Sequence, residues 1–171
     1  MGSTRRSVGS TERDARTVTT LVWRGVDAPR MEIARVERDG RDLRAEGTQI
    51  GVAYELRYRL RGGVLELEVV GGPRCTIAPD DADFVDLGFS PLTNTLPIVR
   101  DGLLESSEPR SYVMALVHVP SLDVERSEQR YEPVSPGVIR FRAGAFTALL
   151  EVDAAGFVLR YPGLAELVAP T

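Results

Sequence analysis

The segment Glu128–Tyr131 carries the side chains best suited to hold a polar ligand. Gln129 offers an amide, Arg130 a planar guanidinium, and Tyr131 a ring with one polar end. Together they suit a phosphate or sugar headgroup that lies beside an apolar cavity. The alternative is an edge strand whose arginine pairs with a carboxylate for structural reasons. Trp23 raises the same question, because a lone tryptophan in a strand either packs in the core or forms a platform for a ligand.

Residues that could act as catalysts or metal ligands are sparse. The sequence contains no G-x-S-x-G nucleophile elbow, no phosphate-binding loop and no H-E-x-x-H helix motif. His118 falls among apolar strand residues and Cys75 has no base beside it, so we predict structural roles for both. One cysteine and one histidine cannot assemble a zinc site of the usual kind within one chain. No metal or other cofactor is therefore expected.

Carboxylates near aromatic residues leave an enzymatic alternative open. Asp83, Asp86, Glu151 and Asp153 are such residues. Two carboxyl groups that face each other across a cleft could hydrolyse a glycosidic bond. A hydrolase acting on a sugar-lipid is therefore retained as an alternative function.

Composition narrows the class of protein. The chain has 171 residues, of which 43% are hydrophobic and 27% charged, which is typical of a folded globular domain. We predict a tail over residues 1–16 and one domain over residues 17–171. The net charge of −4 gives no basic footprint for nucleic acid. No apolar run approaches the length of a membrane span, and the N-terminus lacks a secretory signal, so a cytoplasmic location is expected.

From Val18 onward the pattern predicts strands joined by short turns. A Gly62-Gly63 turn pairs Leu60 with Leu65 and Arg59 with Glu66, so that apolar residues meet on one face and opposite charges on the other. This ladder of Arg and Glu is predicted to be a solvated face. An Asp39-Gly40 turn predicts an earlier hairpin that pairs Val36 with Leu43, although the same register would place Glu37 opposite Asp42.

Two further features concern the second half of the chain. The loop Asp153–Gly156 predicts a late hairpin that pairs Val152 with Phe157 and Leu150 with Leu159. The strand YVMALVHV is apolar on both faces, which indicates that another element packs on the inner side of the sheet.

The stretch DLGFSPLTNTLPI, residues 86–98, interrupts the strand pattern. Ser90 suits a helix N-cap and Pro91 suits the first helical position. Pro97 is predicted to end or bend this short helix. We expect Phe89 and Leu96 to be buried, and Asn94 to bond backbone groups, with ligand contact as the alternative role.

Four segments occur in the order and spacing of a known bacterial family: LVWRGVDAPRMEIARV, VDLGFSPLTNTLPIVR, EQRYEP and LLEVDAAGFVLRYPGL. The chain resembles this family, described as "putative glycolipid-binding" and formerly a domain of unknown function, from about Leu21 to Leu164. The resemblance implies a spiral β-roll: a mainly β fold in which a long, curved antiparallel sheet wraps around one short central helix. The chain departs from the family pattern after Pro97-Ile98. The family usually has two basic residues there, whereas this chain has Val99 in the first place and Arg100 in the second.

These features together predict non-catalytic binding of an amphiphilic ligand, with a glycolipid as the class that the resemblance implies. The ligand's chain would lie in an apolar cavity of the roll, and its head near Arg130, Tyr131 or Arg100. Gln129, Asn94 and Trp23 complete the set of candidate ligand contacts. A second alternative is a protein-interaction module or homodimer that uses an exposed face of the sheet.

Overall fold

The computed structural model describes residues 16–168, so the predicted tail lies outside the described residues except for Arg16. Within this range, thirteen strands and one α-helix follow one another along the chain. The elements are β1 (Thr17–Gly25), β2 (Met31–Asp39), β3 (Asp42–Ile50), β4 (Glu55–Arg61), β5 (Val64–Val69), β6 (Arg74–Ile77), β7 (Phe84–Leu87), α1 (Pro91–Arg100), β8 (Arg110–Val117), β9 (Val124–Ser135), β10 (Val138–Ala143), β11 (Phe146–Val152), β12 (Val158–Tyr161) and β13 (Ala165–Leu167).

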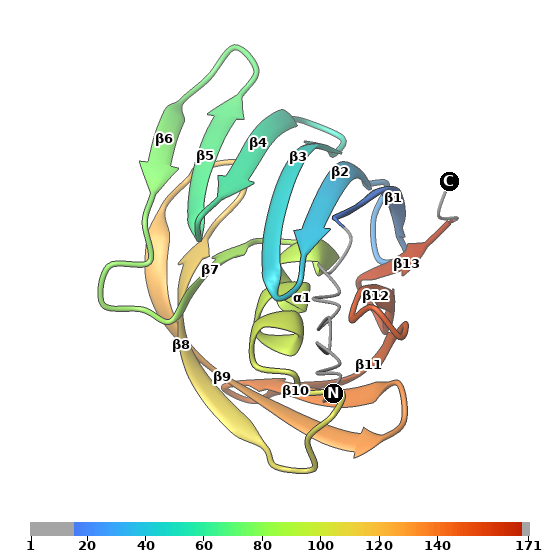
Figure 1. Cartoon of the computed structure of the whole chain (residues 1–171). Helices are drawn as coiled ribbons and strands as arrows, with labels where there is room; N and C mark the ends of the chain where they lie inside the picture. Colours follow the sequence, from blue (N-terminus) through green and yellow to red (C-terminus); the bar gives the residue numbers. More distant parts are fainter. Residues whose placement is uncertain (1–15, 169–171) are drawn as a thin grey trace, which may run out of the picture.

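All thirteen described strands belong to one sheet, in the order β6-β5-β4-β3-β2-β1-β13-β12-β11-β10-β9-β8-β7. The first and last strands pair with each other, which joins the two halves of the chain into one surface. This sheet curls around α1, as Figure 1 shows. The predicted mainly β fold, with a curved sheet around one short central helix, is confirmed.

One pair of strands differs from the predicted antiparallel sheet. β7 and β8 are parallel, with Phe84 opposite Met114. Parallel neighbours need a crossover connection, and α1 forms part of the one between these two strands. The helix therefore sits inside the roll because the chain must cross the concave side of the sheet to return in the same direction.

The second hairpin has the predicted register. Leu60 pairs with Leu65 and Arg59 with Glu66. The first hairpin turns at the predicted place but in another register: Val36 pairs with Ala45, two positions beyond its predicted partner. This register sets Glu37 opposite Arg44 instead of opposite an acidic residue. The loop residues are then Gly40 and Arg41, and Gly40 supplies the positive φ of 59° at the first loop position.

The late hairpin also forms, with a register that differs from the prediction. Val152 pairs with Val158, and a bulge separates this pair from Glu151 and Arg160. The side chain of Asp153 explains the shift, because its Oδ1 accepts hydrogen bonds from the backbone N–H groups of Ala155 and Phe157. These bonds hold a longer turn than the alternation alone predicts.

The helix begins as predicted, with Ser90 as the N-cap and Pro91 as the first residue. Pro97 does not end it, since the helix continues to Arg100. Every residue from Pro91 to Val99 is buried, Leu96 included. The expected burial of Phe89 is wrong: this side chain is 42% exposed. Its φ of 65° turns the chain sharply before the helix.

Candidate functional site

A ring of buried polar side chains connects the first turns of α1 to β7 and β9. Asp86 on β7 accepts two hydrogen bonds, from Thr93 Oγ1 at 2.7 Å and from Gln129 Nε2 at 2.6 Å. On β9, the Tyr131 hydroxyl donates to Gln129 Oε1 at 3.1 Å and accepts from Asn94 Nδ2 at 2.9 Å. The ring joins the helix to two strands that lie far apart in the sequence, so it fixes α1 inside the roll.

The carboxyl group of Asp86 is the charged member of this ring. Burial raises its pKa above the usual range, and the hydrogen bonds from Gln129 and Thr93 partly oppose this effect. Both donors are uncharged. A buried carboxylate held by amide and hydroxyl groups keeps lone pairs that a ligand could reach.

A second buried carboxyl group lies on the other side of the helix start. Glu32 Oε1 accepts from the Tyr58 hydroxyl at 2.6 Å and from Ser90 Oγ at 2.7 Å. Its Oε2 has no hydrogen-bond partner among the described residues. Burial raises the pKa of Glu32 to about 7, against the lowering effect of both hydrogen bonds. The Ser90 side chain therefore donates to Glu32 and makes no capping hydrogen bond to its own helix.

Glycine at position 47 makes room for the tyrosine of this second cluster. A Cβ atom there would lie 2.4 Å from Cζ of Tyr58, closer than any real contact. The neighbouring Gln49 is also buried and bonds the carbonyl of Gly88 at 3.1 Å, while Tyr54 donates to its Oε1. Strand β3 thus anchors the turn between β7 and α1.

A cavity of about 210 Å³ opens beside this turn. Its polar lining consists of Asp86, Ser90, Asn94, Ser127 and Gln129. Its aromatic lining consists of Phe89, Phe141, Phe146 and Tyr161. The rings of Phe141, Phe146 and Tyr161 lie within 6.2 Å of one another, centroid to centroid, and form one continuous wall. The cavity therefore has a buried polar floor and an aromatic wall.

Phe89 is the most unusual part of this wall. A positive φ is uncommon for a residue with a side chain and costs roughly 1–3 kcal/mol. The residue nevertheless leaves its ring 42% exposed, so packing does not account for it. The guanidinium of Arg30 lies 4.5 Å from the ring centroid, a cation–π contact that holds the ring in place. Exposed aromatic surface at the edge of a cavity is typical of ligand-binding sites.

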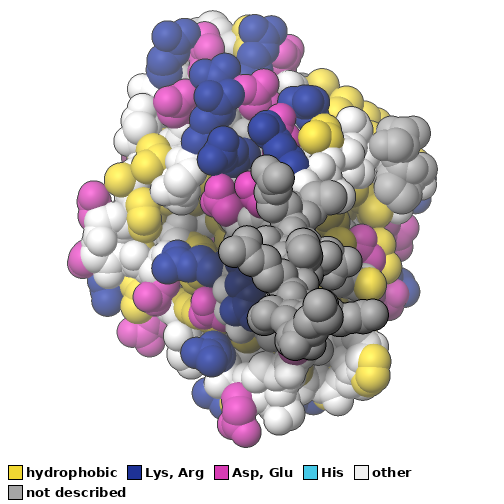
Figure 2. Space-filling model, in the orientation of Figure 1, with side chains coloured by type: hydrophobic (Ala, Val, Ile, Leu, Met, Phe, Trp, Pro, Cys, Tyr) yellow, Lys and Arg dark blue, Asp and Glu magenta, His cyan; other side chains and the backbone are white. Residues whose placement is uncertain are grey.

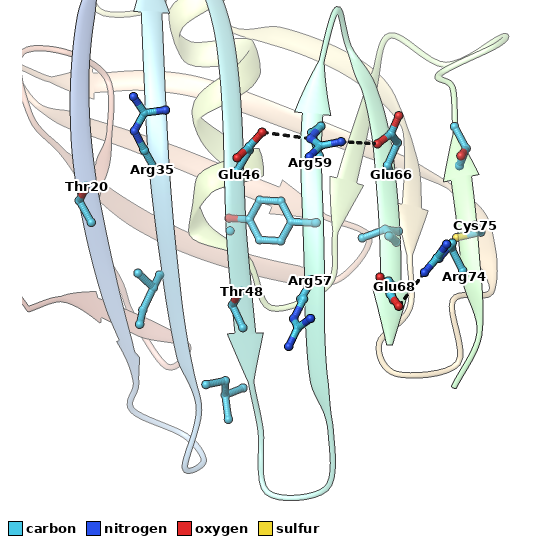
Figure 3. A pocket seen from close by; sticks show the side chains of 16 residues that line it. Thr20, Arg35, Glu46, Thr48, Arg57, Arg59, Glu66, Glu68, Arg74 and Cys75 are labelled. Carbon is cyan, nitrogen blue, oxygen red and sulfur yellow. Dashed lines mark hydrogen bonds and ion pairs between the residues drawn. The ribbon is translucent and has the colours of Figure 1, made fainter. Parts of the chain in front are cut away.

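A second, larger hollow is an open groove of about 860 Å³ on the side of β1–β6 that faces away from α1. Figure 3 shows its charged side chains, with Arg59 between Glu46 and Glu66 and Arg74 beside Glu68. Figure 2 shows basic and acidic side chains interleaved over the upper part of the molecule, where these strands lie. The predicted solvated ladder is confirmed, and its charges are paired with each other. The alternative protein-interaction function would use this face.

The structure brings together three of the six predicted ligand contacts. Gln129 and Asn94 line the cavity, and Tyr131 connects them. Arg130 is exposed on the opposite face of β9, where it pairs with Arg142 and Ser111. Because successive strand residues point to opposite faces, the guanidinium cannot share the pocket of its two neighbours.

The other two predicted contacts also lie away from the cavity. Arg100 is exposed at the end of α1 and stacks on the ring of Phe84 at 4.9 Å. Trp23 is 1% exposed and donates its indole N–H to the carbonyl of Val158 at 2.7 Å. It is a core residue.

The carboxylates that suggested a hydrolase do not converge. Asp83 accepts from the backbone of Val113, and Glu151 lies 3.7 Å from Arg160 on the outer face. Asp153 accepts hydrogen bonds from backbone N–H groups of its own turn. Asp86 alone of the four lines the cavity.

Sequence reasoning missed Glu32, Ser90 and the aromatic wall. The signal for Glu32 is present, because it alternates in phase with Ala34 and Val36, which face the core. An acidic residue in phase with buried apolar residues indicates a buried carboxyl group. No such local signal exists for Phe141, Phe146 and Tyr161, which meet only when β10, β11 and β12 pair.

Two other findings concern metals and membranes. Residues 16–168 contain no group of three or more His, Cys, Asp or Glu side chains placed to hold a metal ion. Within the same range, no helix has both the length and the apolar character needed to cross a membrane.

Comparison with known proteins bears on both fold and family. The structure is similar to the crystal structure of a DUF1089 family protein from Pseudomonas aeruginosa, with 21% sequence identity and a TM-score of 0.55. The similarity covers 95% of this chain and 99% of the other, which supports the β-roll fold. No curated protein matches the chain. The model of a family described as "Putative glycolipid-binding" matches residues 69–166, more than half of the sequence. The chain therefore belongs to this family.

Proposed function

We propose that the chain binds an amphiphilic ligand, with a glycolipid as the class that the family suggests, through the cavity at the start of α1. The observation that carries the proposal is the combination of a buried polar floor with a partly exposed aromatic wall. Sites for small ligands combine apolar walls with a few well-placed polar groups in this way.

The polar floor has hydrogen-bonding capacity left for a ligand. Asp86 accepts one bond at each oxygen, which leaves further lone pairs. The amides of Asn94 and Gln129 each use one N–H in the ring and keep a second. Hydroxyl groups of a ligand could both donate to the carboxylate and accept from these amides. The aromatic wall would contact the apolar faces of the same headgroup.

The size of the cavity decides which part of the ligand it holds. Its 210 Å³ is below the roughly 300–1,000 Å³ typical of sites for drug-sized molecules. The interior of the roll around α1 is filled by core side chains. We therefore place the headgroup in the cavity and the hydrocarbon chain outside it, a reversal of the arrangement predicted from the sequence.

An apolar surface next to the cavity suits the hydrocarbon chain. A third, open hollow is lined by four side chains that are each at least 41% exposed: Val26, Met31, Ile50 and Val52. Arg30 connects the cavity to this third hollow, because it lines the hollow, stacks on Phe89 and donates to the carbonyl of Leu164. Figure 2 shows hydrophobic side chains gathered at the upper right, next to the turn between β3 and β4.

The proposal is one of binding without chemistry. Two polar groups of the lining already have hydrogen-bond partners: the Ser90 hydroxyl donates to Glu32, and the carboxyl group of Asp86 accepts from Thr93 and Gln129. These bonds support a recognition role for Ser90 and Asp86, since a nucleophile or general acid must be free to exchange its proton with a substrate.

The test is a variant that fills the cavity. Ala143 lines it, and Ala143→Phe should abolish most binding of octyl glucoside, measured by titration calorimetry below its micellar concentration. Thr147→Phe is the matched control, because Thr147 is an exposed residue of the adjacent strand β11. Equal affinity in Ala143→Phe and wild type, with both folded, would contradict this placement. Native mass spectrometry of freshly purified protein, followed by organic extraction, would identify any amphiphile that it carries.

A further inference from the structure

We infer that this site selects by charge: it accepts a headgroup that donates hydrogen bonds and has no negative charge, and it excludes sulfated or phosphorylated headgroups. The inference rests on the proposed function, because it concerns the headgroup that the same cavity would hold. It assigns to Asp86 the part of the specificity-determining residue.

The first support is the distribution of charge around the cavity. Asp86 is the carboxylate of the lining, and no arginine lines the cavity. Its two hydrogen-bond donors, Thr93 and Gln129, are uncharged, so no cation is bonded to it. A bound anion would lie near this buried negative charge in a region of low dielectric, where repulsion is stronger than in water.

The helix start does not reverse this preference. The N-terminus of an α-helix carries a partial positive charge of about half a unit and can bind anions. In this protein Pro91 occupies the first helical position and has no N–H to donate. Two buried carboxyl groups, Asp86 and Glu32, already lie at this end of α1 and bond residues of its first turns.

The neighbouring guanidinium already has an anionic partner. Arg30 stacks on Phe89, and its Nη2 bonds the carboxylate of Asp27 at 2.7 Å and the carbonyl of Leu164 at 3.2 Å. Its side chain is only 7% exposed. Asp27 therefore already offsets part of the charge that Arg30 could offer to an anionic headgroup.

The hydrogen bonds already made within the lining determine which ligand groups it can bind. Ser90 donates its hydroxyl proton to Glu32, so it can only accept toward the cavity. Asp86 can only accept while it is ionised. Hydroxyl and ammonium groups are the donors that suit these acceptors, and the remaining N–H groups of Asn94 and Gln129 can donate to the oxygen of the same hydroxyl groups. The guanidinium predicted to bind an anion, Arg130, lies on the other face of β9.

The experiment compares three amphiphiles with the same octyl chain: octyl glucoside, octylammonium and octyl sulfate. Each is titrated below its micellar concentration at pH 8 by calorimetry. We expect octyl glucoside or octylammonium, or both, to bind at least about tenfold more tightly than octyl sulfate. The order of the first two tells whether the donor is hydroxyl or ammonium. Octyl sulfate binding as tightly as both would overturn the inference, whereas no binding by any of the three would instead contradict the proposed function.

A pair of variants assigns the selectivity to one residue. Asp86→Asn should raise the affinity for octyl sulfate at least about tenfold relative to that for octyl glucoside. Glu128→Gln is the control, because it removes the same charge from the exposed face of β9, next to Gln129. An unchanged affinity ratio in a folded Asp86→Asn protein would refute the role of Asp86. If that variant does not fold, the wild-type comparison of the three amphiphiles still decides the charge preference.

Discussion

The outer groove and the inner cavity both carry polar side chains, but they differ in what surrounds those groups. In the groove, Arg59 bridges Glu46 and Glu66 while all three side chains remain about half exposed to water. At the cavity, Asp86 and Glu32 are buried and bonded to uncharged groups. Exposed ion pairs contribute little because water competes with them, whereas a buried polar group must find partners or be destabilising. Substitutions at the cavity should therefore change stability and binding more than substitutions in the groove.

The aromatic wall of the cavity should show the largest effect. Phe141 is 4% exposed and contacts the rings of Tyr131, Phe146 and Tyr161. We expect Phe141→Ala to lower the free energy of unfolding by about 3–5 kcal/mol, because it leaves a void in a packed region. Equilibrium unfolding in urea measures this.

The control for this prediction lies on the neighbouring strand. Leu149 on β11 is 47% exposed, and Leu149→Ala should change the free energy of unfolding by no more than about 0.5 kcal/mol. A loss below about 1 kcal/mol for Phe141→Ala would show that the wall is not part of the core.

The buried Glu32 should make stability depend on pH. Its pKa is about 7 in the folded protein against 4.5 without burial, so the folded state holds the proton more tightly. The resulting stabilisation is fully present below about pH 4.5 and is lost as the pH rises through 7. At about 1.4 kcal/mol for each unit of difference in pKa, the loss amounts to about 3 kcal/mol.

Glu32→Gln tests this directly, because glutamine has a similar shape and does not titrate. Urea unfolding at pH 5 and pH 8 should show a smaller difference for the variant than for the wild type, by about 2.5 kcal/mol, because part of the stabilisation is already lost at pH 5. The exposed Glu66 of the groove supplies the comparison, and Glu66→Gln should keep the wild-type difference. The same pH dependence in Glu32→Gln and wild type would rule out Glu32 as its source.

A substitution in the groove should change the free energy of unfolding only slightly. Arg59→Ala removes contacts of 3.0 Å to Glu46 and 3.5 Å to Glu66, yet we expect a loss of no more than about 1 kcal/mol. The loss should shrink further at high salt, which screens exposed charges. Unfolding in urea at two salt concentrations checks both statements. A salt-independent loss above about 2 kcal/mol would remove the distinction between the two hollows.

The two hairpins of the first half show how much of the fold the sequence predicts. Where apolar and charged patterns agree on one register, as around Gly62-Gly63, the predicted pairs are those observed. Where the turn residues and the charge pattern disagree, as around Asp39-Gly40, the observed register differs from the one that the turn predicts and sets Glu37 opposite Arg44. Local rules therefore give the strands, but the register follows the sum of cross-strand contacts.

The site is less predictable, for a physical reason. The sequence indicates Gln129 and Tyr131 because they lie in one polar segment, but the same segment includes Arg130, which strand alternation sends to the outer face. Asp86 and Glu32 become partners of the same helix only when the sheet has closed around α1. A cavity wall assembled from β10, β11 and β12 is a property of the curvature of the sheet, which no single segment encodes.

Phe89 should show the smallest effect on stability together with a clear effect on binding. At a φ of 65°, glycine is unstrained, so Phe89→Gly relieves backbone strain while it removes the ring and its contact with Arg30. These effects oppose each other, and we expect a net change within about 1 kcal/mol in the free energy of unfolding. Phe89→Ala also removes the ring but keeps the strain.

The two variants separate the effect of backbone strain from the effect of the aromatic ring. Phe89→Ala should be less stable than Phe89→Gly by about 1 kcal/mol, the reverse of the order found where φ is negative. Both should bind octyl glucoside more weakly than the wild type to a similar extent, because both lack the exposed aromatic surface. Unfolding in urea and calorimetric titration on the same preparations give the two readouts. Wild-type affinity in both variants would remove Phe89 from the site and leave Phe141, Phe146 and Tyr161 as its wall.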